Sequence, residues 1–447
     1  MSRYDAIVIG ASVGGLAAAA LLAKGGARVL LLEKRLAPPE PAGPLFALDP
    51  VLVKRLKLQA HGLAFRRPAL GTMLWDDEDE ALLLPPQARG AARALARLSR
   101  ADAEAWEPFQ TDLKARARAL RRWWFRPQAA GSADAVFWSQ GARRRFAHDS
   151  LMGAEAFLAR DFESPRLIGA LMHDALGGGL SPAEPGSAVA LLWRAAQAMA
   201  GVQGAVALAL PGSVSMALKA VCGADMRFGD AVTEVLVGRG AAGVRLADGD
   251  TIEARAVISS LPRAKTEALA GLARPAATRQ VGEAQILLTL EDGYALPPLL
   301  QANRAVLSLL PADYADAFEA ARAGRLARAL PLSLVAEGPL RLVLTAPLAP
   351  VAPQAGWPAF QAPFAAAAIQ SLRRHLPGLA GALSAVTVVP PKPLARGGLA
   401  HLLAPALARA ATSVERLWLC GPEAEPVPCV SGRAGRFAAQ FAARALR

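Results

Sequence analysis

The chain opens with a pattern of apolar and helix-forming residues that predicts three successive elements. Residues 6–9 form a continuous apolar run, which is typical of a parallel strand buried on both faces. The glycine-containing turn 10–15 separates this run from the alanine- and leucine-rich residues 16–24, which favour a helix. Residues 28–33 form a second apolar run that ends in an acid. The pattern therefore predicts a strand–helix–strand unit within residues 4–34.

Helical patterning dominates the next part of the chain. Residues 90–125 alternate charged side chains with alanine and leucine, with a break expected at Pro108, and residues 154–160 and 188–200 follow the same period. Polar residues and glycines interrupt the apolar stretch 188–210, which favours a core or interfacial helix over a membrane span.

Strand patterns return after Pro211. We expect a long strand over residues 228–237 and shorter ones over 243–246 and 256–262, with a hairpin turn at 248–250. Four further elements are expected, namely a strand at 340–345, a helix at 364–376, a strand at 416–421 and a helix at 432–446. This alternation indicates an α/β fold in which segments of one parallel sheet are separated by inserted segments.

The turn between the first strand and its helix has the chemistry of a phosphate cradle. Gly10 can make the sharp turn out of the strand, and Gly15 lets the helix pack closely on the sheet. The helix that begins around Val13 and Gly14 offers backbone amides and a partial positive charge to a pyrophosphate. Ser12 replaces the middle glycine of the usual GxGxxG pattern. Serine is small, and its hydroxyl can donate a hydrogen bond to a phosphate.

The second strand ends at Glu33, followed by Lys34. An acid roughly 20 residues beyond the first glycine accepts hydrogen bonds from an adenosine ribose in dinucleotide-binding units. It also repels a 2′-phosphate, which disfavours NADP. The complete unit therefore predicts an adenine dinucleotide site.

Composition narrows the class of protein. The chain has 447 residues, which predicts two or three structural units, and 53% of them are hydrophobic, which disfavours disorder. The formal net charge is +13. No zinc-ligand spacing or base-reading helix accompanies this charge, so we expect no nucleic-acid partner and no metal site.

Two interpretations of the basic clusters stay open. Residues 121–124, Arg-Arg-Trp-Trp, and the three arginines at 143–145 form either a solvated basic face or a peripheral contact with membrane headgroups. The cysteines at 222, 420 and 429 are too widely spaced for a disulfide framework, and no leader precedes the first strand, so we expect a cytoplasmic protein.

Taken together, these features resemble the phytoene desaturase-like branch of the FAD-dependent amine oxidase and desaturase superfamily. The resemblance rests on the N-terminal unit, on residues 208–213, on the strand around Val232, on 258–262 and on 417–436. It implies a Rossmann-like FAD-binding domain assembled from three segments, 1–70, 205–285 and 396–447. An inserted α+β substrate domain would comprise 71–204 and 286–395.

The resemblance also implies the role of each site residue. Gly10, Ser12, Gly15 and Glu33 would hold the pyrophosphate and adenosine, and the backbone of Val232 would contact adenine. Gly421 and the stretch from Val430 through Ser431 would approach the ribityl chain and flavin ring. A helix beginning near Val430 would direct its amides at the pyrimidine side of the flavin.

Three departures from the family pattern concern the cofactor. A paired-glycine motif after the ribose acid is replaced by residues 36–41, Leu-Ala-Pro-Pro-Glu-Pro, and a glycine-rich turn near the end is replaced by 426–429, Pro-Val-Pro-Cys. Ser213 replaces a further glycine. The first two changes lie near the expected flavin, so they bear on the tightness of its binding.

Catalytic residues are not identified by the sequence. The pairs His148-Asp149 and His173-Asp174 offer acid–base groups or are structural. Cys429 is expected on the substrate side of the flavin, as a contact, a redox-sensitive thiol or a small hydrophobic residue.

By resemblance, we expect an FAD-dependent oxidoreductase acting on a hydrophobic substrate of isoprenoid or carotenoid type. One alternative is a flavin amine oxidase, although that class places aromatic residues where Cys429 stands. The other is a degenerate, non-catalytic protein that keeps the fold and serves as a binding protein.

Overall fold

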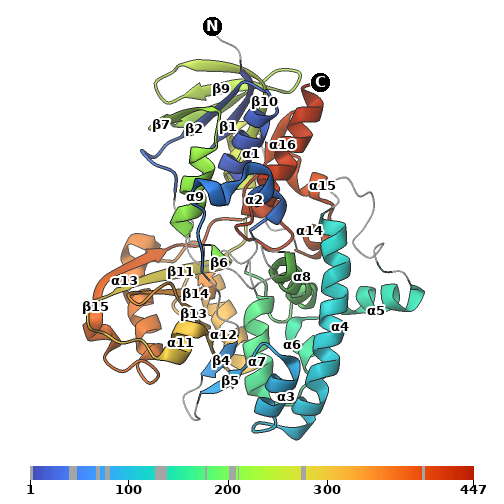
Figure 1. Ribbon diagram of the computed structural model, residues 1–447, viewed down its shortest axis with the longest axis vertical. Coiled ribbons are helices and arrows are strands. Elements are labelled where there is room, and N and C mark those ends of the chain that lie inside the picture. Colours follow the sequence, from blue (N-terminus) through green and yellow to red (C-terminus); the bar gives the residue numbers. More distant parts are fainter. Residues whose placement is uncertain are drawn as a thin grey trace.

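The computed structural model describes residues 4–39, 48–66, 71–75, 81–125, 137, 139–176, 179–200, 208–209, 211–272, 278–394 and 398–447. Two seven-stranded sheets and a group of helices form the molecule (Figure 1). The strands of the first sheet are β1 (Tyr4–Ile9), β2 (Val29–Glu33), β7 (Asp225–Phe228), β8 (Val232–Val237), β9 (Ala241–Leu246), β10 (Thr251–Ser259) and β16 (Leu417–Leu419). Those of the second sheet are β4 (Thr72–Trp75), β5 (Leu82–Leu84), β11 (Val281–Leu290), β12 (Arg304–Leu307), β13 (Ser333–Ala336), β14 (Arg341–Pro350) and β15 (Leu383–Val389).

The helices and short elements lie around these sheets. The longer helices are α1 (Val13–Lys24), α3 (Ala88–Leu95), α4 (Arg100–Trp124), α5 (Gln140–Ser150), α7 (Pro165–Ala175), α8 (Ser187–Ala200), α9 (Pro211–Ala220), α12 (Pro311–Arg322), α13 (Gly356–Leu372) and α16 (Arg433–Ala445). The shorter elements are α2 (Pro50–Leu56), η1 (Leu58–His61), β3 (Phe65–Arg66), α6 (Ala154–Leu158), β6 (Leu208–Ala209), α10 (Arg263–Leu269), α11 (Pro298–Ala302), η3 (Leu379–Ala382), α14 (Gly398–Leu403), α15 (Ala406–Ala410) and η4 (Pro422–Ala424).

The first sheet brings together three distant parts of the chain. Its order is β7-β2-β1-β10-β9-β8, with β16 also paired to β10, and β1, β2, β7, β10 and β16 run parallel. Ala6 and Val8 pack toward α1, whereas Ile7 and Ile9 pack toward β8 and β9, so β1 is buried on both faces. The predicted Rossmann-like α/β unit is confirmed, because its apolar runs, glycine turn and helix occupy the expected positions.

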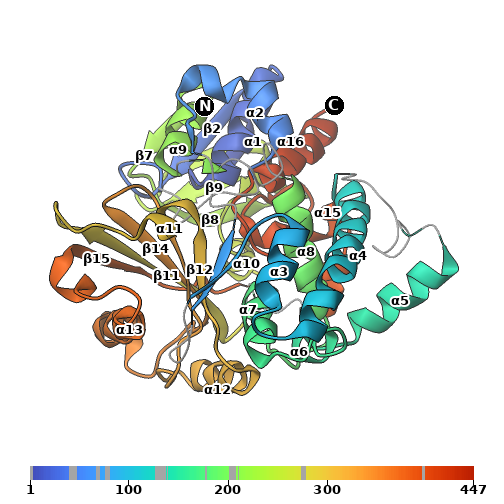
Figure 2. The ribbon, with the colours of Figure 1, turned by 60° about the horizontal axis from the view of Figure 1, so that its bottom comes forward.

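The second sheet also joins separate segments. Its order is β15-β11-β14-β13-β12-β4-β5, and β4 pairs with β12 in parallel. Figure 2 shows this sheet on one side of the molecule and the helices α3 to α8 on the other. The strand β11 begins at Val281, before the boundary at 285 that the resemblance implies, and the domain boundaries stay a prediction.

Two local predictions are wrong. Pro108 lies inside α4 and does not break it. Pro108 and Glu104 are exposed, so water can satisfy the carbonyl that loses its partner, while buried Trp106 and Phe109 hold the helix on either side. The single strand expected over 228–237 is two strands, because Gly229 turns the chain between them with φ +93°.

Two further elements differ in position or exposure. The helix expected at 364–376 begins at Gly356 and ends at Leu372.

Trp123 and Trp124 are 3% and 1% exposed within an aromatic core, so these tryptophans do not reach a membrane interface. The arginines at 143–145 are exposed on α5, which projects from the body in Figures 1 and 2. Among the described residues, no helix combines the length and apolarity needed to cross a bilayer.

Candidate functional site

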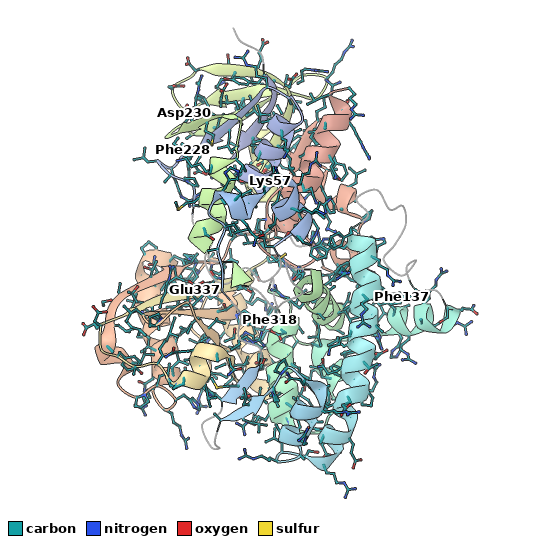
Figure 3. All side chains as sticks on the ribbon, in the orientation of Figure 1. Lys57, Phe137, Phe228, Asp230, Phe318 and Glu337 are labelled. Atoms are coloured by element: carbon teal, nitrogen blue, oxygen red, sulfur yellow. The ribbon has the colours of Figure 1, made fainter. Side chains whose placement is uncertain are left out.

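A cavity of about 550 Å³ lies at the carboxyl ends of the parallel strands of the first sheet. This is the edge at which open α/β sheets bind ligands. The C-terminal segment and the second sheet complete its walls, and Asp230, labelled in Figure 3 at the edge of the first sheet, is among its lining residues. The predicted site residues that line it are Gly10, Ser12, Val13, Gly14, Glu33, Lys34, Val232, Gly421, Val430 and Ser431. Gly15 is not among the lining residues.

The glycines of the N-terminal turn permit close packing. Gly10 has φ +90°, and a Cβ there would lie 2.3 Å from Ser260 Oγ. A Cβ on Gly14 would lie 1.9 Å from the carbonyl oxygen of Cys420, and one on Gly15 would lie 2.0 Å from that of Gly10. Helix α1 is therefore pressed against both its own turn and the end of β16. The sequence did not reveal the contact of Gly14, because Cys420 is far away along the chain.

Ser12 is the N-cap of α1. Its Oγ accepts a hydrogen bond from the amide of Gly15 at 3.3 Å. The amides of Val13 and Gly14 belong to the same first turn, where backbone N–H groups lack intrahelical partners. These two residues line the cavity, so the positive end of α1 is directed at it. The serine that departs from the glycine pattern thus stabilises the helix end.

Glu33 is fixed at the cavity wall by backbone donors. Its Oε2 accepts from the amide of Ala11 at 2.8 Å, and its Oε1 accepts from the amide of Arg35 at 3.1 Å. The side chain is 5% exposed. Each carboxylate oxygen can accept more than one hydrogen bond, so Glu33 can also accept from a ligand hydroxyl.

The loop at 426–429 is held by polar side chains of α8. Gln197 Nε2 donates to the carbonyl of Val427 at 2.6 Å, and Arg194 Nη1 donates to the carbonyl of Pro428 at 3.3 Å. Both carbonyls lie in the segment where the resemblance leads one to expect glycines. The substituted loop is therefore anchored by its backbone.

Glu425 is a site residue that the sequence analysis missed. Its carboxylate accepts from Trp124 Nε1 at 2.9 Å, from Ser431 Oγ at 2.5 Å and from the amide of Ala434 at 3.1 Å. The amide of Arg433 donates to Ser431 Oγ at 2.9 Å. Two first-turn amides of α16 are therefore already bound within the chain. Only a long-range contact reveals this role, since no local motif marks Glu425.

The second sheet supplies the wall opposite α1. Glu283, Gln285 and Leu287 alternate along β11 and line the cavity, whereas the residues between them face the core. Arg194 Nη2 lies 3.5 Å from Glu283 Oε2. The Glu283 side chain is 34% exposed, and its enclosure by surrounding protein raises its pKa, an effect that Arg194 opposes. The alternation along β11 was the available signal, but the sequence analysis did not single out this strand.

Cys429 lines the cavity beside this wall. Burial raises the pKa of its thiol well above the ordinary range, and the nearby Glu425 adds to this effect. The neutral thiol is a weak nucleophile, so the site favours a contact role over a reactive one.

Neither His-Asp pair lines the cavity. Asp149 is fully buried and accepts from Arg116 and Arg160, while the His148 side chain is 69% exposed. Asp174 binds Arg304 through two hydrogen bonds, at 2.8 and 3.0 Å. Burial lowers the pKa of His173 to about 3. These contacts give both His-Asp pairs a structural role.

No metal centre is evident in the described part of the chain, where no three His, Cys, Asp or Glu side chains gather in a way that could hold an ion.

Comparison with known proteins supports the fold assignment. A family model described as an NAD(P)-binding Rossmann-like domain matches residues 8–38. No curated protein matches the sequence.

Solved structures match over the whole chain. An oxidoreductase from Methanosarcina mazei is 14% identical, with 98% of this chain and 99% of that chain covered and a TM-score of 0.63. Putrescine oxidase bound to putrescine is 15% identical, with 99% of each chain covered and a TM-score of 0.63. Cyclohexylamine oxidase from Brevibacterium oxydans is 16% identical, with 100% of this chain and 99% of that chain covered and a TM-score of 0.58. At these identities the similarity establishes a shared fold, and the chain has the mixed α/β architecture of these oxidoreductases.

Proposed function

We propose that the protein is an FAD-dependent oxidoreductase acting on a hydrophobic substrate. The observation that carries the proposal is the continuity of one cavity, which extends from the end of α1 and Glu33 to residues 420–432 and the second sheet. A dinucleotide with a reactive ring at one end needs such a continuous site.

The N-terminal part of the cavity fits the adenosine diphosphate portion of FAD. The first-turn amides of α1 would hold the pyrophosphate, and the free acceptor capacity of Glu33 would hold ribose hydroxyls. Val232 lines the cavity, and by the family resemblance its backbone would contact adenine. Gly10 and Gly14 leave no room for a side chain, which keeps this cradle compact.

The other part of the cavity is suited to the ring and an apolar substrate. Gly421, Val430 and Ser431 line it from the C-terminal segment, and apolar side chains such as Leu287 and Val389 line it from the second sheet. When bound, the flavin would supply the capacity to accept a hydride. The protein would orient the substrate and exclude water. An isoprenoid or carotenoid-like substrate is the specific form of this proposal.

A flavin amine oxidase is a second candidate. Putrescine oxidase and cyclohexylamine oxidase share the fold, and the partly exposed carboxylate of Glu283 could attract a cationic amine. The two enzymes are distinguished by offering the protein putrescine, cyclohexylamine or apolar polyenes and following reduction of the flavin. Only an amine oxidase would reduce its flavin with the two amines.

A non-catalytic binding protein is the third candidate, and the internal hydrogen bonds at the start of α16 favour it. The visible absorption spectrum of the purified protein, before and after addition of FAD, separates it from both enzymes. Flavin bands near stoichiometric occupancy would support an oxidoreductase. A colourless protein that ignores added FAD would overturn the proposal.

A further inference from the structure

We propose that Glu425 holds the reduction potential of the bound flavin low by placing a negative charge at the start of α16. This inference rests on the proposed function, because it concerns FAD in the cavity. The family resemblance implies only the positive end of a helix at this position. In this protein a carboxylate of the chain itself also lies there.

The hydrogen bonds define the charge of this group. Trp124 Nε1, Ser431 Oγ and the amide of Ala434 all donate to the Glu425 carboxylate. An ionised carboxylate only accepts hydrogen bonds, so three donors favour the ionised form. The side chain is 1% exposed, and Glu425 is a lining residue of the cavity.

The carboxylate changes the electrostatics of the helix end. The N-terminus of a helix carries a charge equivalent to roughly +0.5, which would stabilise a reduced, anionic ring. A full negative charge bonded to the Ala434 amide more than offsets it. Burial keeps this charge poorly screened by solvent.

Buried Arg409 and Arg433 interact electrostatically with Glu425, and within the described part of the chain no arginine forms an ion pair with its oxygens. Arg433 is fully buried, stacks 3.8 Å from the ring centre of Trp124 and lies 3.7 Å from Asp49. Asp49 also accepts from Arg436 at 2.6 Å, and Arg409 donates to the carbonyl of Ala424 at 3.1 Å. These three arginines face two carboxylates, so neutralising Glu425 increases an excess of positive charge that is already present.

The test uses the full chain loaded with FAD. Glu425→Gln retains the size of the side chain and removes its charge. We expect sulfite, which adds to electron-poor flavins, to bind the variant about tenfold more tightly. We expect the two-electron midpoint potential to rise by about 30 mV, the equivalent of a tenfold change in equilibrium constant. Both are read from the flavin absorption spectrum, without a substrate.

Three further variants keep the test specific. Glu425→Asp retains the charge and should remain near the wild-type potential. Glu423→Gln removes a buried carboxylate that accepts from the amide of Arg263 and does not line the cavity, so it should raise the potential less than Glu425→Gln does. Glu425→Ala, also neutral, replaces the glutamine variant if that protein does not fold.

The outcomes separate this inference from the proposed function. Flavin binding with equal potentials in the wild type and the neutral variants would overturn the role of Glu425 alone. Equal shifts in the Glu423 and Glu425 variants would also overturn it. A wild type that binds no flavin would overturn the proposed function and this inference with it.

Discussion

The carboxylate of Glu33 lies 2.8 Å from the backbone nitrogen of Ala11, which connects the end of β2 to the turn that follows β1. The ribose acid of the proposed site is therefore also part of the cradle. Its removal should affect the fold and the ligand together.

We predict that Glu33→Ala weakens FAD retention and lowers the free energy of unfolding. Two backbone amides, those of Ala11 and Arg35, lose their acceptor, at a cost of about 1–3 kcal/mol for each donor left buried. FAD titration and urea unfolding measure the two effects. Glu234→Ala is the control, because the Glu234 side chain is half exposed and forms an ion pair with Arg245 on the neighbouring strand. Unchanged flavin affinity in the Glu33 variant would disprove the ribose assignment.

Gly14→Ala should destabilise the protein by separating α1 from the end of β16. The added Cβ would lie 1.9 Å from the carbonyl oxygen of Cys420, and overpacking of this kind costs about 1–3 kcal/mol. Gly141→Ala is a matched control on helix α5, where the added Cβ meets nothing within 4 Å. Thermal unfolding should show a lower Tm for the first variant and an equal or higher Tm for the second. The reverse order would show that α1 can move away from β16 at little cost.

Gln197→Leu should loosen the loop at 426–429 while retaining the apolar packing of α8. The variant removes the donor 2.6 Å from the carbonyl of Val427, and a buried acceptor left without a partner costs about 1–3 kcal/mol. We expect reduced stability and weaker FAD binding in equilibrium titrations. A variant with wild-type affinity would show that this loop does not shape the flavin end of the cavity.

Burial of His173 should make the free energy of unfolding depend on pH in the acidic range. Burial lowers its pKa in the folded protein to about 3 from an ordinary value of 6.5. Between these values the unfolded chain binds a proton that the folded chain does not. The stability contributed by the neutral ring is therefore fully present above pH 6.5, and it falls by about 1.4 kcal/mol per pH unit as the pH drops toward 3.

The measurement is urea unfolding at pH 7 and pH 5 for the wild type and for His173→Gln. The difference in stability between the two pH values should be smaller in the variant. His148→Gln is the control, because the His148 side chain is 69% exposed. Equal pH dependence in the wild type and His173→Gln would contradict the predicted role of burial.

The first unit of the fold could be predicted because its signals are local. An apolar run, a turn with glycines and an acid at the end of β2 lie within 34 residues, and each follows from propensity or backbone geometry. Pro108 shows the limit of such reasoning, since the packing of Trp106 and Phe109 preserves the helix against the local preference of proline.

The wall of the site that contains Glu283 and Glu425 could not be predicted, because its contacts join residues that are far apart in the sequence. Glu425 acquires its role from Trp124 and Ala434, and Glu283 acquires its role from Arg194 on helix α8. Glutamate is common on surfaces, and no spacing distinguishes these two from the rest. The residues nearest the reactive end of the proposed ligand are thus the ones that only tertiary structure identifies.

The pairing of β10 with both β1 and β16 has a consequence for synthesis of the protein. The strand β10 is made more than 240 residues after β1, and β16 is made later still. The nascent protein must therefore carry an unpaired, apolar β1 edge until β10 has been made, a state prone to aggregation. We infer that the cradle closes only after β16 has been made, so that chaperone supply during expression would govern the yield of folded protein.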